Sequence, residues 1–294
     1  MGEWFALGSA LCFAASNVAV VRGAQRGSGD NGAFLSLLLT AVISGAGWLW
    51  TSAVHGPAPI TMRGALWLAA AGVFTAFIGR VFLYASIEHL GAIRASAVKR
   101  LNPFFAVLLG VAVLGEQLSG HVVWGALLIV ASFGLLVQAQ WPGATTPSAP
   151  TRLNLGYLYG PLSALGHALG YLMRKAGLND TPDPFFGAMV GTLVGAALFV
   201  VAGRWSEPYQ RAVDATWRRP NPWLYTAGFL GSFGQILYFA ALNASPMSKV
   251  ALVASMEVFI TIGLSLLFLA ERLSWQVALA ALLGFAGTAL LMVV

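Results

Sequence analysis

The sequence predicts an all-α membrane protein whose ten transmembrane helices form two inverted five-helix repeats. Three observations predict this fold. The chain of 294 residues is 58% hydrophobic and only 9% charged, whereas about 25% of the residues in a soluble domain are charged. Ten apolar stretches are close to the roughly 20 residues that a helix needs to cross a bilayer. The second half of the chain also repeats the pattern of the first.

A chain this apolar cannot cover a water-facing surface, so we expect the lipid bilayer to be its solvent. The net charge of +6 comes mostly from basic residues in loops, where membrane topology and lipid headgroups account for them. We therefore expect no nucleic-acid partner. The single cysteine, Cys12, allows no internal disulfide, and the four histidines are scattered. The sequence therefore indicates no metal site and no other cofactor.

Polar breaks separate the ten predicted helices. The shortest breaks, such as 116–118 and 271–273, predict tight antiparallel hairpins, and an even number of helices places both termini on one side. The longest break is expected to be a solvated or interfacial loop because it contains Arg204, Arg211, Arg218 and Arg219. The predicted helices span residues 3–21, 31–54, 64–88, 92–115, 119–138, 154–175, 184–203, 222–242, 246–270 and 274–294.

The chain contains an internal duplication. The motif Gly115–Ser119 closes the fourth predicted helix, and Ala270–Ser274 closes the ninth helix 155 positions later. The same offset pairs Gly79 with Gly234, Arg80 with Gln235, and Asn102 with Glu257, while the first and sixth helices align one residue off. Because five helices are an odd number, the second repeat must enter the membrane in the opposite sense. We expect a first repeat at 1–140, a linker at 141–153 and a second repeat at 154–294. Secondary transporters built in this way bind substrate near the midplane, between the repeats.

These motifs resemble the drug/metabolite transporter superfamily, and specifically its EamA-type transporters. In that family a proline and an apolar run lead to Leu-Gly-Glu-x-Leu-Ser, and here Pro103 leads to Leu114–Ser119. The second half departs slightly from the family pattern, because Val258 replaces a proline and Ala270 replaces a glycine. The resemblance covers nearly the whole chain. It implies transport across the inner membrane of a prokaryotic cell, but it does not specify the substrate, because the family moves amino acids, metabolites and drugs.

Four polar residues are predicted to lie near the bilayer midplane: Asn17, Asn102, His167 and Glu257. An ionised side chain at this depth costs about 3 kcal/mol, so it usually faces the protein interior and usually has a function. We expect these four residues to line one substrate cavity. Glu257 and His167 can each exchange a proton, so both are candidates for proton coupling. The alternative for each of the four is a hydrogen bond that only holds helices together.

A second group is basic. Arg80 and Lys99 lie at similar depths on the hairpin of the third and fourth predicted helices, where they can bind an anionic group of the substrate. Arg100 points away from Lys99 and contributes less. The alternative is that these long side chains reach back to the lipid headgroups. Tyr84 and Tyr171 are the aromatic candidates for the walls of the site.

Three further residues are assigned structural roles. Glu116 and Glu271 end helices, and their carboxylates are expected to accept hydrogen bonds from backbone N–H groups at the start of the following helix. Pro103 lies inside the fourth predicted helix, where it should cause a kink and free a backbone carbonyl.

The orientation in the membrane stays open. The family resemblance implies cytoplasmic termini, whereas the loop arginines favour termini outside. That comparison places Arg174 and Lys175 at the end of the sixth helix.

The function predicted from all these features is secondary active transport, in the export direction, of a small polar, zwitterionic or anionic metabolite, by alternating access with possible proton coupling. The protein is expected to act as a monomer or homodimer. One alternative is a non-transporting receptor or scaffold subunit, which a filled interior would indicate. A remote alternative is an intramembrane enzyme. The sequence has no HExxH or GxSxG motif and no ATP-binding loop, so neither such an enzyme nor an ATP-driven pump is indicated.

Overall fold

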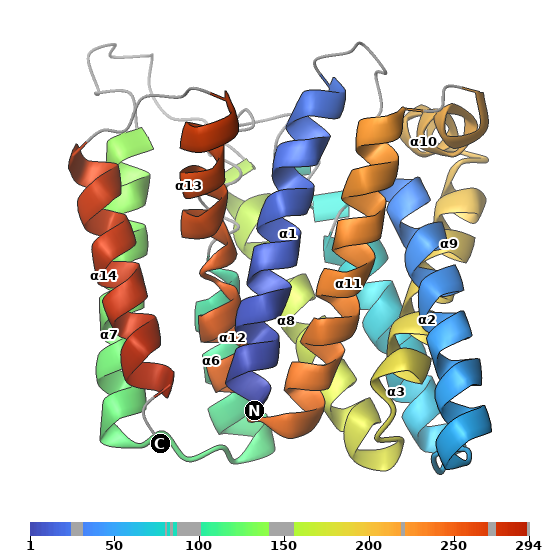
Figure 1. Cartoon of the computed structure of the whole chain (residues 1–294), viewed down its shortest axis with the longest axis horizontal. Coiled ribbons are helices and arrows are strands. Elements are labelled where there is room, and N and C mark those ends of the chain that lie inside the picture. The colour runs from blue at the N-terminus through green and yellow to red at the C-terminus, as the bar shows by residue number, and fades with distance from the viewer. Residues whose placement is uncertain are drawn as a thin grey trace.

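The computed structural model describes residues 1–24, 32–79, 81–82, 85–86, 101–140, 156–218, 221–269 and 275–292. Within these ranges every regular element is a helix (Figure 1), as the sequence predicts. Four described segments are each long and apolar enough to span a membrane: Gly2–Gly23, Ala33–His55, Pro184–Ala202 and Met247–Phe268. The count of ten transmembrane helices stays a prediction.

The first half of the chain contributes α1 (Gly2–Ala24), α2 (Ala33–His55), α3 (Met62–Gly72), the π-helix η1 (Val73–Ile78), α6 (Asn102–Leu114) and α7 (Gly120–Gln140). The second half contributes α8 (Gly156–Asp180), α9 (Pro184–Ala202), α10 (Glu207–Arg218), α11 (Pro222–Ala244), α12 (Met247–Ala254), α13 (Glu257–Leu269) and α14 (Trp275–Met292). Side-chain caps start several of these helices. Asp183 accepts hydrogen bonds from the first amides of α9, and Asn221 accepts one from the first turn of α11.

The helix boundaries differ from the prediction at two places that matter for the site. The helix predicted at 154–175 continues to Asp180, so Arg174 lies within α8 and not at its end. The helix predicted at 246–270 is interrupted by a turn between α12 and α13. At this turn the hydroxyl of Ser255 donates to the carbonyl of Leu252 (2.5 Å), which competes with the backbone ladder.

The polar segment 204–221, which we expected to be a loop, contains the amphipathic helix α10. Its Tyr209 is buried, with ring centroids 4.9 Å from Phe199 and 6.0 Å from Phe77, while Trp217 is 72% exposed. Figure 1 shows α10 lying across the ends of α9 and α2, at the face opposite the N-terminus. One buried aromatic face and one polar face are typical of a helix at the membrane interface.

The internal repeat is visible in matching contacts. The hydroxyl of Ser9 donates to the carbonyl of Gly234 (2.7 Å), and the hydroxyl of Ser163 donates to the carbonyl of Gly79 (2.6 Å). Ser163 follows Ser9 by 154 positions and Gly234 follows Gly79 by 155, so the two bonds are the same contact made once by each repeat. α1 accordingly packs along α11, and α3 packs along α8.

The crossing of α7 and α14 shows the same relation. Gly125 and Gly287 approach so closely that a Cβ on either would lie within 2.8 Å of the other's carbonyl oxygen. The corresponding contact, shifted by 155 positions, is a hydrogen bond of 2.7 Å from Ser132 to the carbonyl of Ala280. Small residues thus allow close backbone approach at both contacts between α7 and α14.

The counterpart helices α1 and α8 run in opposite directions. Ser245, at the end of α11, donates to Glu3 in the first turn of α1 (3.3 Å), and its carbonyl accepts from Lys175 in the last part of α8 (3.0 Å). The start of α1 and the end of α8 therefore meet at one face of the molecule, where Figure 1 places the N-terminus. This is the relation that an inverted repeat requires.

Candidate functional site

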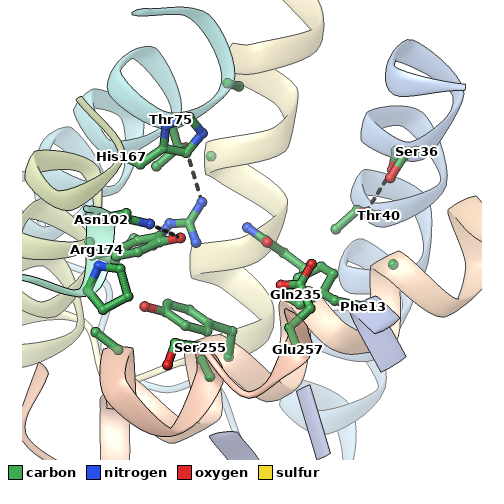
Figure 2. Close-up of a pocket in the computed structure, with 18 of the residues that line it drawn as sticks. Phe13, Ser36, Thr40, Thr75, Asn102, His167, Arg174, Gln235, Ser255 and Glu257 are labelled. Carbon is green, nitrogen blue, oxygen red and sulfur yellow. Dashed lines mark hydrogen bonds between the residues drawn. The ribbon is translucent and has the colours of Figure 1, made fainter. Parts of the chain in front are cut away.

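A cavity of about 480 Å³ lies between the two repeats and is lined by α1, α2, η1, α6 and α7 from the first half and by α8, α9, α11, α12 and α13 from the second. This volume is in the range of small-molecule sites. Figure 2 shows the guanidinium of Arg174 among Thr75, Asn102 and Gln235, with Glu257 beyond Gln235. Within the described residues no three His, Cys, Asp or Glu side chains gather to hold a metal ion.

Arg174 is the central cation of the cavity, with only 7% of the residue exposed. Its Nη2 donates to the hydroxyl of Thr75 (3.0 Å), which itself donates to the carbonyl of Ala71. With the amide of Gln235 oriented so that its oxygen faces the guanidinium, that oxygen accepts from Nη2 (3.0 Å) and Nη1 (3.3 Å). Thr75 belongs to η1, and π-helical turns often occur at functional sites.

Aromatic rings surround the same guanidinium. Its Cζ lies 4.8 Å from the ring centroid of Phe239, 5.4 Å from that of Tyr171 and 5.8 Å from that of Tyr238. The faces of these rings attract a cation, and arginine is hydrated weakly enough to be held in this way. The rings stabilise the charge without neutralising it.

Among the described residues no carboxylate pairs with Arg174, and its Nε has no hydrogen-bond partner. A charge near the middle of a bilayer costs about 3 kcal/mol, and buried charges are normally paired. Arg174 is thus a buried cation at a cavity wall without a counter-ion among the described residues, and such an arrangement indicates a binding site for an anion.

Two hydrogen bonds at the wall of the cavity are related by the repeat. The Nδ2 of Asn17 donates to Glu257 (2.7 Å), and the Nδ2 of Asn102 donates to the hydroxyl of Tyr171 (3.2 Å). Tyr171 is the counterpart of Asn17, and Glu257 is the counterpart of Asn102. Each bond therefore joins the first helix of one repeat to the fourth helix of the other, with different chemistry on the two sides.

His167 occupies the place that Phe13 has in the first repeat. The ring of His167 packs against Gly79 so closely that a Cβ there would clash with it, and Phe13 packs in the same way against Gly234. The Nδ1 of His167 lies 2.8 Å from the carbonyl of Ser163. The ring is therefore held in a fixed position at the cavity wall.

The structure brings several of the predicted site residues together. The residues that line the cavity are Asn17, Asn102, His167, Tyr171 and Glu257. The predicted residues outside the described part of the chain are Arg80, Tyr84, Lys99, Arg100 and Glu271. That any of these residues binds substrate or couples protons stays a prediction.

Arg174 and its partner Gln235 were not predicted as site residues. Arg174 was assigned to a helix end because the sixth helix was predicted to stop at residue 175. The signal that places it deeper is the Asp183-Pro184 cap, which starts the next helix and leaves room for α8 to continue to Asp180. Lys175 stays within the helix because its ammonium group binds the carbonyls of Leu242 (2.6 Å) and Ser245 (3.0 Å).

The motif glutamate caps a different helix from the one expected. Glu116 accepts from the backbone N–H groups of Met247 (2.5 Å) and Ser248 (2.9 Å), at the start of α12 and not of α7. Gly115 has a φ of 65°, which favours glycine and reverses the chain so that the carboxylate lies over Gly110. Pro103 was expected to kink a helix from its interior. It lies instead at the second position of α6, where proline is well accommodated.

The EamA-like transporter family model matches residues 1–138 and 154–293. The chain belongs to this family. Membership establishes a membrane transporter built from two EamA repeats, and it agrees with the resemblance seen in the sequence motifs. A solved structure titled "Crystal structure of protein" is similar in fold, with a TM-score of 0.68 and 18% sequence identity over 99% of this chain and 96% of that chain. No curated protein matches the sequence at a significant level.

Proposed function

We propose that this EamA-like protein is a secondary active transporter that exports a small anionic or zwitterionic metabolite by alternating access. The observation that carries the proposal is the buried guanidinium of Arg174, which faces a cavity between two inverted repeats and has no described counter-ion. The anionic group of the substrate binds Arg174, because charge-assisted hydrogen bonds to arginine are strong and directional.

Glu257 is the proposed proton-coupling group. It stands at the first residue of α13, where the helix dipole favours a carboxylate, and it accepts a hydrogen bond from Asn17 on α1. Protonation removes the charge that this contact stabilises, so it changes how α1 and α13 are held together. A proton at Glu257 thereby alters the balance between the two arrangements of the repeats.

The cavity also bears on the alternatives. A receptor or scaffold subunit needs no space between the repeats, whereas about 480 Å³ is present and lined by both halves. An intramembrane enzyme needs a nucleophile beside its acid or base, whereas the EamA-like family to which this chain belongs consists of transporters.

The test is flux into proteoliposomes with a pool of organic anions and zwitterions, measured by mass spectrometry under an imposed pH gradient. The Arg174→Gln variant should lose at least about 90% of the flux, since one lost charge-assisted bond corresponds to tenfold or more. Arg63→Gln is the matched control, because Arg63 is an exposed arginine paired with Asp180 (3.3 Å) outside the cavity.

The Glu257→Gln variant tests the coupling separately. It should still exchange substrate across the membrane without a gradient, but the pH gradient should no longer drive accumulation. If Glu257→Gln accumulates substrate at the normal rate, Glu257 does not couple protons to transport. If Arg174→Gln shows normal flux, Arg174 does not bind the anionic group of the substrate.

A further inference from the structure

Three buried polar atoms of the cavity have no hydrogen-bond partner: Nε of Arg174, Oη of Tyr238 and Oδ1 of Asn102. Buried polar groups are nearly always satisfied, because leaving one unpaired is costly. Three unsatisfied atoms on the wall of one cavity therefore mark positions at which a bound molecule supplies the partners.

The three atoms belong to one connected group of side chains, with Tyr171 at its centre. Asn102 donates to the hydroxyl of Tyr171 (3.2 Å), and the rings of Tyr171 and Tyr238 lie 4.9 Å apart. The guanidinium of Arg174 lies over both rings. One small molecule in the cavity can therefore contact all three.

The chemistry of the three atoms restricts the ligand. Nε of Arg174 can only donate, and it carries part of a positive charge. Oδ1 of Asn102 can only accept, and it is the amide atom left unpaired because Nδ2 donates to the hydroxyl of Tyr171. The hydroxyl of Tyr238 can donate to an anion held by Arg174. A ligand that satisfies all three atoms must present an anionic acceptor and, a few atoms away, a hydrogen-bond donor.

Gln235 adds a second restriction. Its amide oxygen sits at the Nη1–Nη2 edge of Arg174, which is an edge where a carboxylate binds arginine. A neutral oxygen there holds the guanidinium in place but leaves its charge available. A glutamate at this position would neutralise Arg174 permanently and would compete with the substrate.

We infer that the cavity is selective for carboxylates that carry a nearby hydroxyl or ammonium group. Arg174 and Tyr238 bind the carboxylate, Asn102 accepts from the donor, and Gln235 keeps Arg174 unneutralised. This inference rests on the proposed function in taking the substrate to bind inside the cavity, and it adds the class of substrate and the residues that select it.

The first test measures binding to the full-length protein in nanodiscs by isothermal titration. The probes are 3-phenylpropanoate, 3-phenyllactate, phenylalanine and 3-phenyllactamide, whose phenyl group suits a cavity lined by Phe13 and Phe133. Phenyllactate, phenylalanine or both should bind about tenfold more tightly than phenylpropanoate, the value expected for one hydrogen bond to a buried group. The neutral amide should bind at least about tenfold more weakly than phenyllactate. The comparison of phenyllactate with phenylalanine shows whether the donor is a hydroxyl or an ammonium group.

Variants assign these preferences to residues. Asn102→Leu should lose the preference for a donor, so that phenyllactate and phenylalanine bind it no more tightly than phenylpropanoate does. Tyr238→Phe should weaken every carboxylate severalfold and leave the amide unaffected. The inference is overturned if phenylpropanoate binds as well as both donor-bearing acids, if the amide binds as well as phenyllactate, or if none of the probes binds at 10 mM.

The Gln235→Glu variant gives a test without any ligand. An internal carboxylate beside Arg174 should raise the melting temperature and weaken phenyllactate binding at least tenfold, and the additional change Arg174→Gln should abolish the gain. Gln210→Glu, the same change at an exposed position of α10, is the control and should show neither effect. A Gln235→Glu protein without a gain in stability would show that Arg174 is already neutralised.

The inference and the proposed function can fail separately. If the probes bind with the inferred preferences but the protein shows no flux, only the transport proposal is contradicted. If flux depends on Arg174 but the probes lack the inferred preferences, only the inference is contradicted.

Discussion

Replacing Glu116 should destabilise the protein strongly, because its carboxylate holds two amides at the start of α12 across the boundary between the repeats. In Glu116→Leu both N–H groups lose their acceptor, and each unsatisfied buried donor costs about 1–3 kcal/mol. The expected loss of stability is therefore about 2–6 kcal/mol. Glu116→Gln keeps one acceptor oxygen and loses the charge, so it should lose about half as much.

The assay is thermal unfolding in one detergent at fixed protein concentration. For a chain of this size each kcal/mol lowers the melting temperature by roughly 2 °C, so Glu116→Leu should melt roughly 4–12 °C lower and Glu116→Gln should lie between it and the unmodified protein. Glu207→Gln is the control, because Glu207 pairs with Arg211 at the surface, where both side chains are more than 70% exposed. Such a pair contributes about 0.3–0.5 kcal/mol. A Glu116→Leu protein that melts within 1 °C of the unmodified one would refute the capping role.

Three further substitutions test the packing around the site. Gly79→Ala should displace the ring of His167 and lower both flux and melting temperature. The control Gly134→Ala, where a Cβ meets nothing within 4 Å, should be neutral or slightly stabilising. Equal behaviour of the two variants would contradict the close contact between Gly79 and His167. Gly287→Val should separate α7 from α14 and lower the melting temperature by several degrees, with Gly263→Val as the control in open space; an unchanged melting temperature would count against the close crossing. Lys175→Met should free the carbonyls of Leu242 and Ser245 at the end of α11 and cost about 1.5–3 kcal/mol in thermal unfolding; a stable variant would show that water replaces the ammonium group.

The sequence was informative where the two repeats constrain each other. The offsets that pair Gly79 with Gly234 and Asn102 with Glu257 recur as matched contacts in the structure, because a duplicated chain folds into duplicated packing. The four residues that were predicted to lie near the midplane, from a rise of 1.5 Å per helical residue, all line the cavity.

The remaining features depend on tertiary structure, which the local pattern does not contain. Hydropathy places Arg174 at a helix end, whereas the surrounding rings, the hydroxyl of Thr75 and the amide oxygen of Gln235 stabilise its buried position. The interruption before α13 has no proline to announce it, because Val258 stands where the family often has one. The partner of Glu116 is 131 residues away, so a search for local caps leads to the wrong helix.

The matched contacts also show how a symmetric scaffold carries an asymmetric site. Within the described cavity the ionisable groups Arg174, His167 and Glu257 all belong to the second repeat. The described residues of the first repeat that line the cavity are neutral. Phe13 stands in the place of His167, and Val20 is the sequence counterpart of Arg174. In the proposed alternating access, Arg174, His167 and Glu257 move together because all three belong to the second repeat. We therefore expect the substrate to keep its bond to Arg174 in both arrangements and to exchange its contacts with the first repeat.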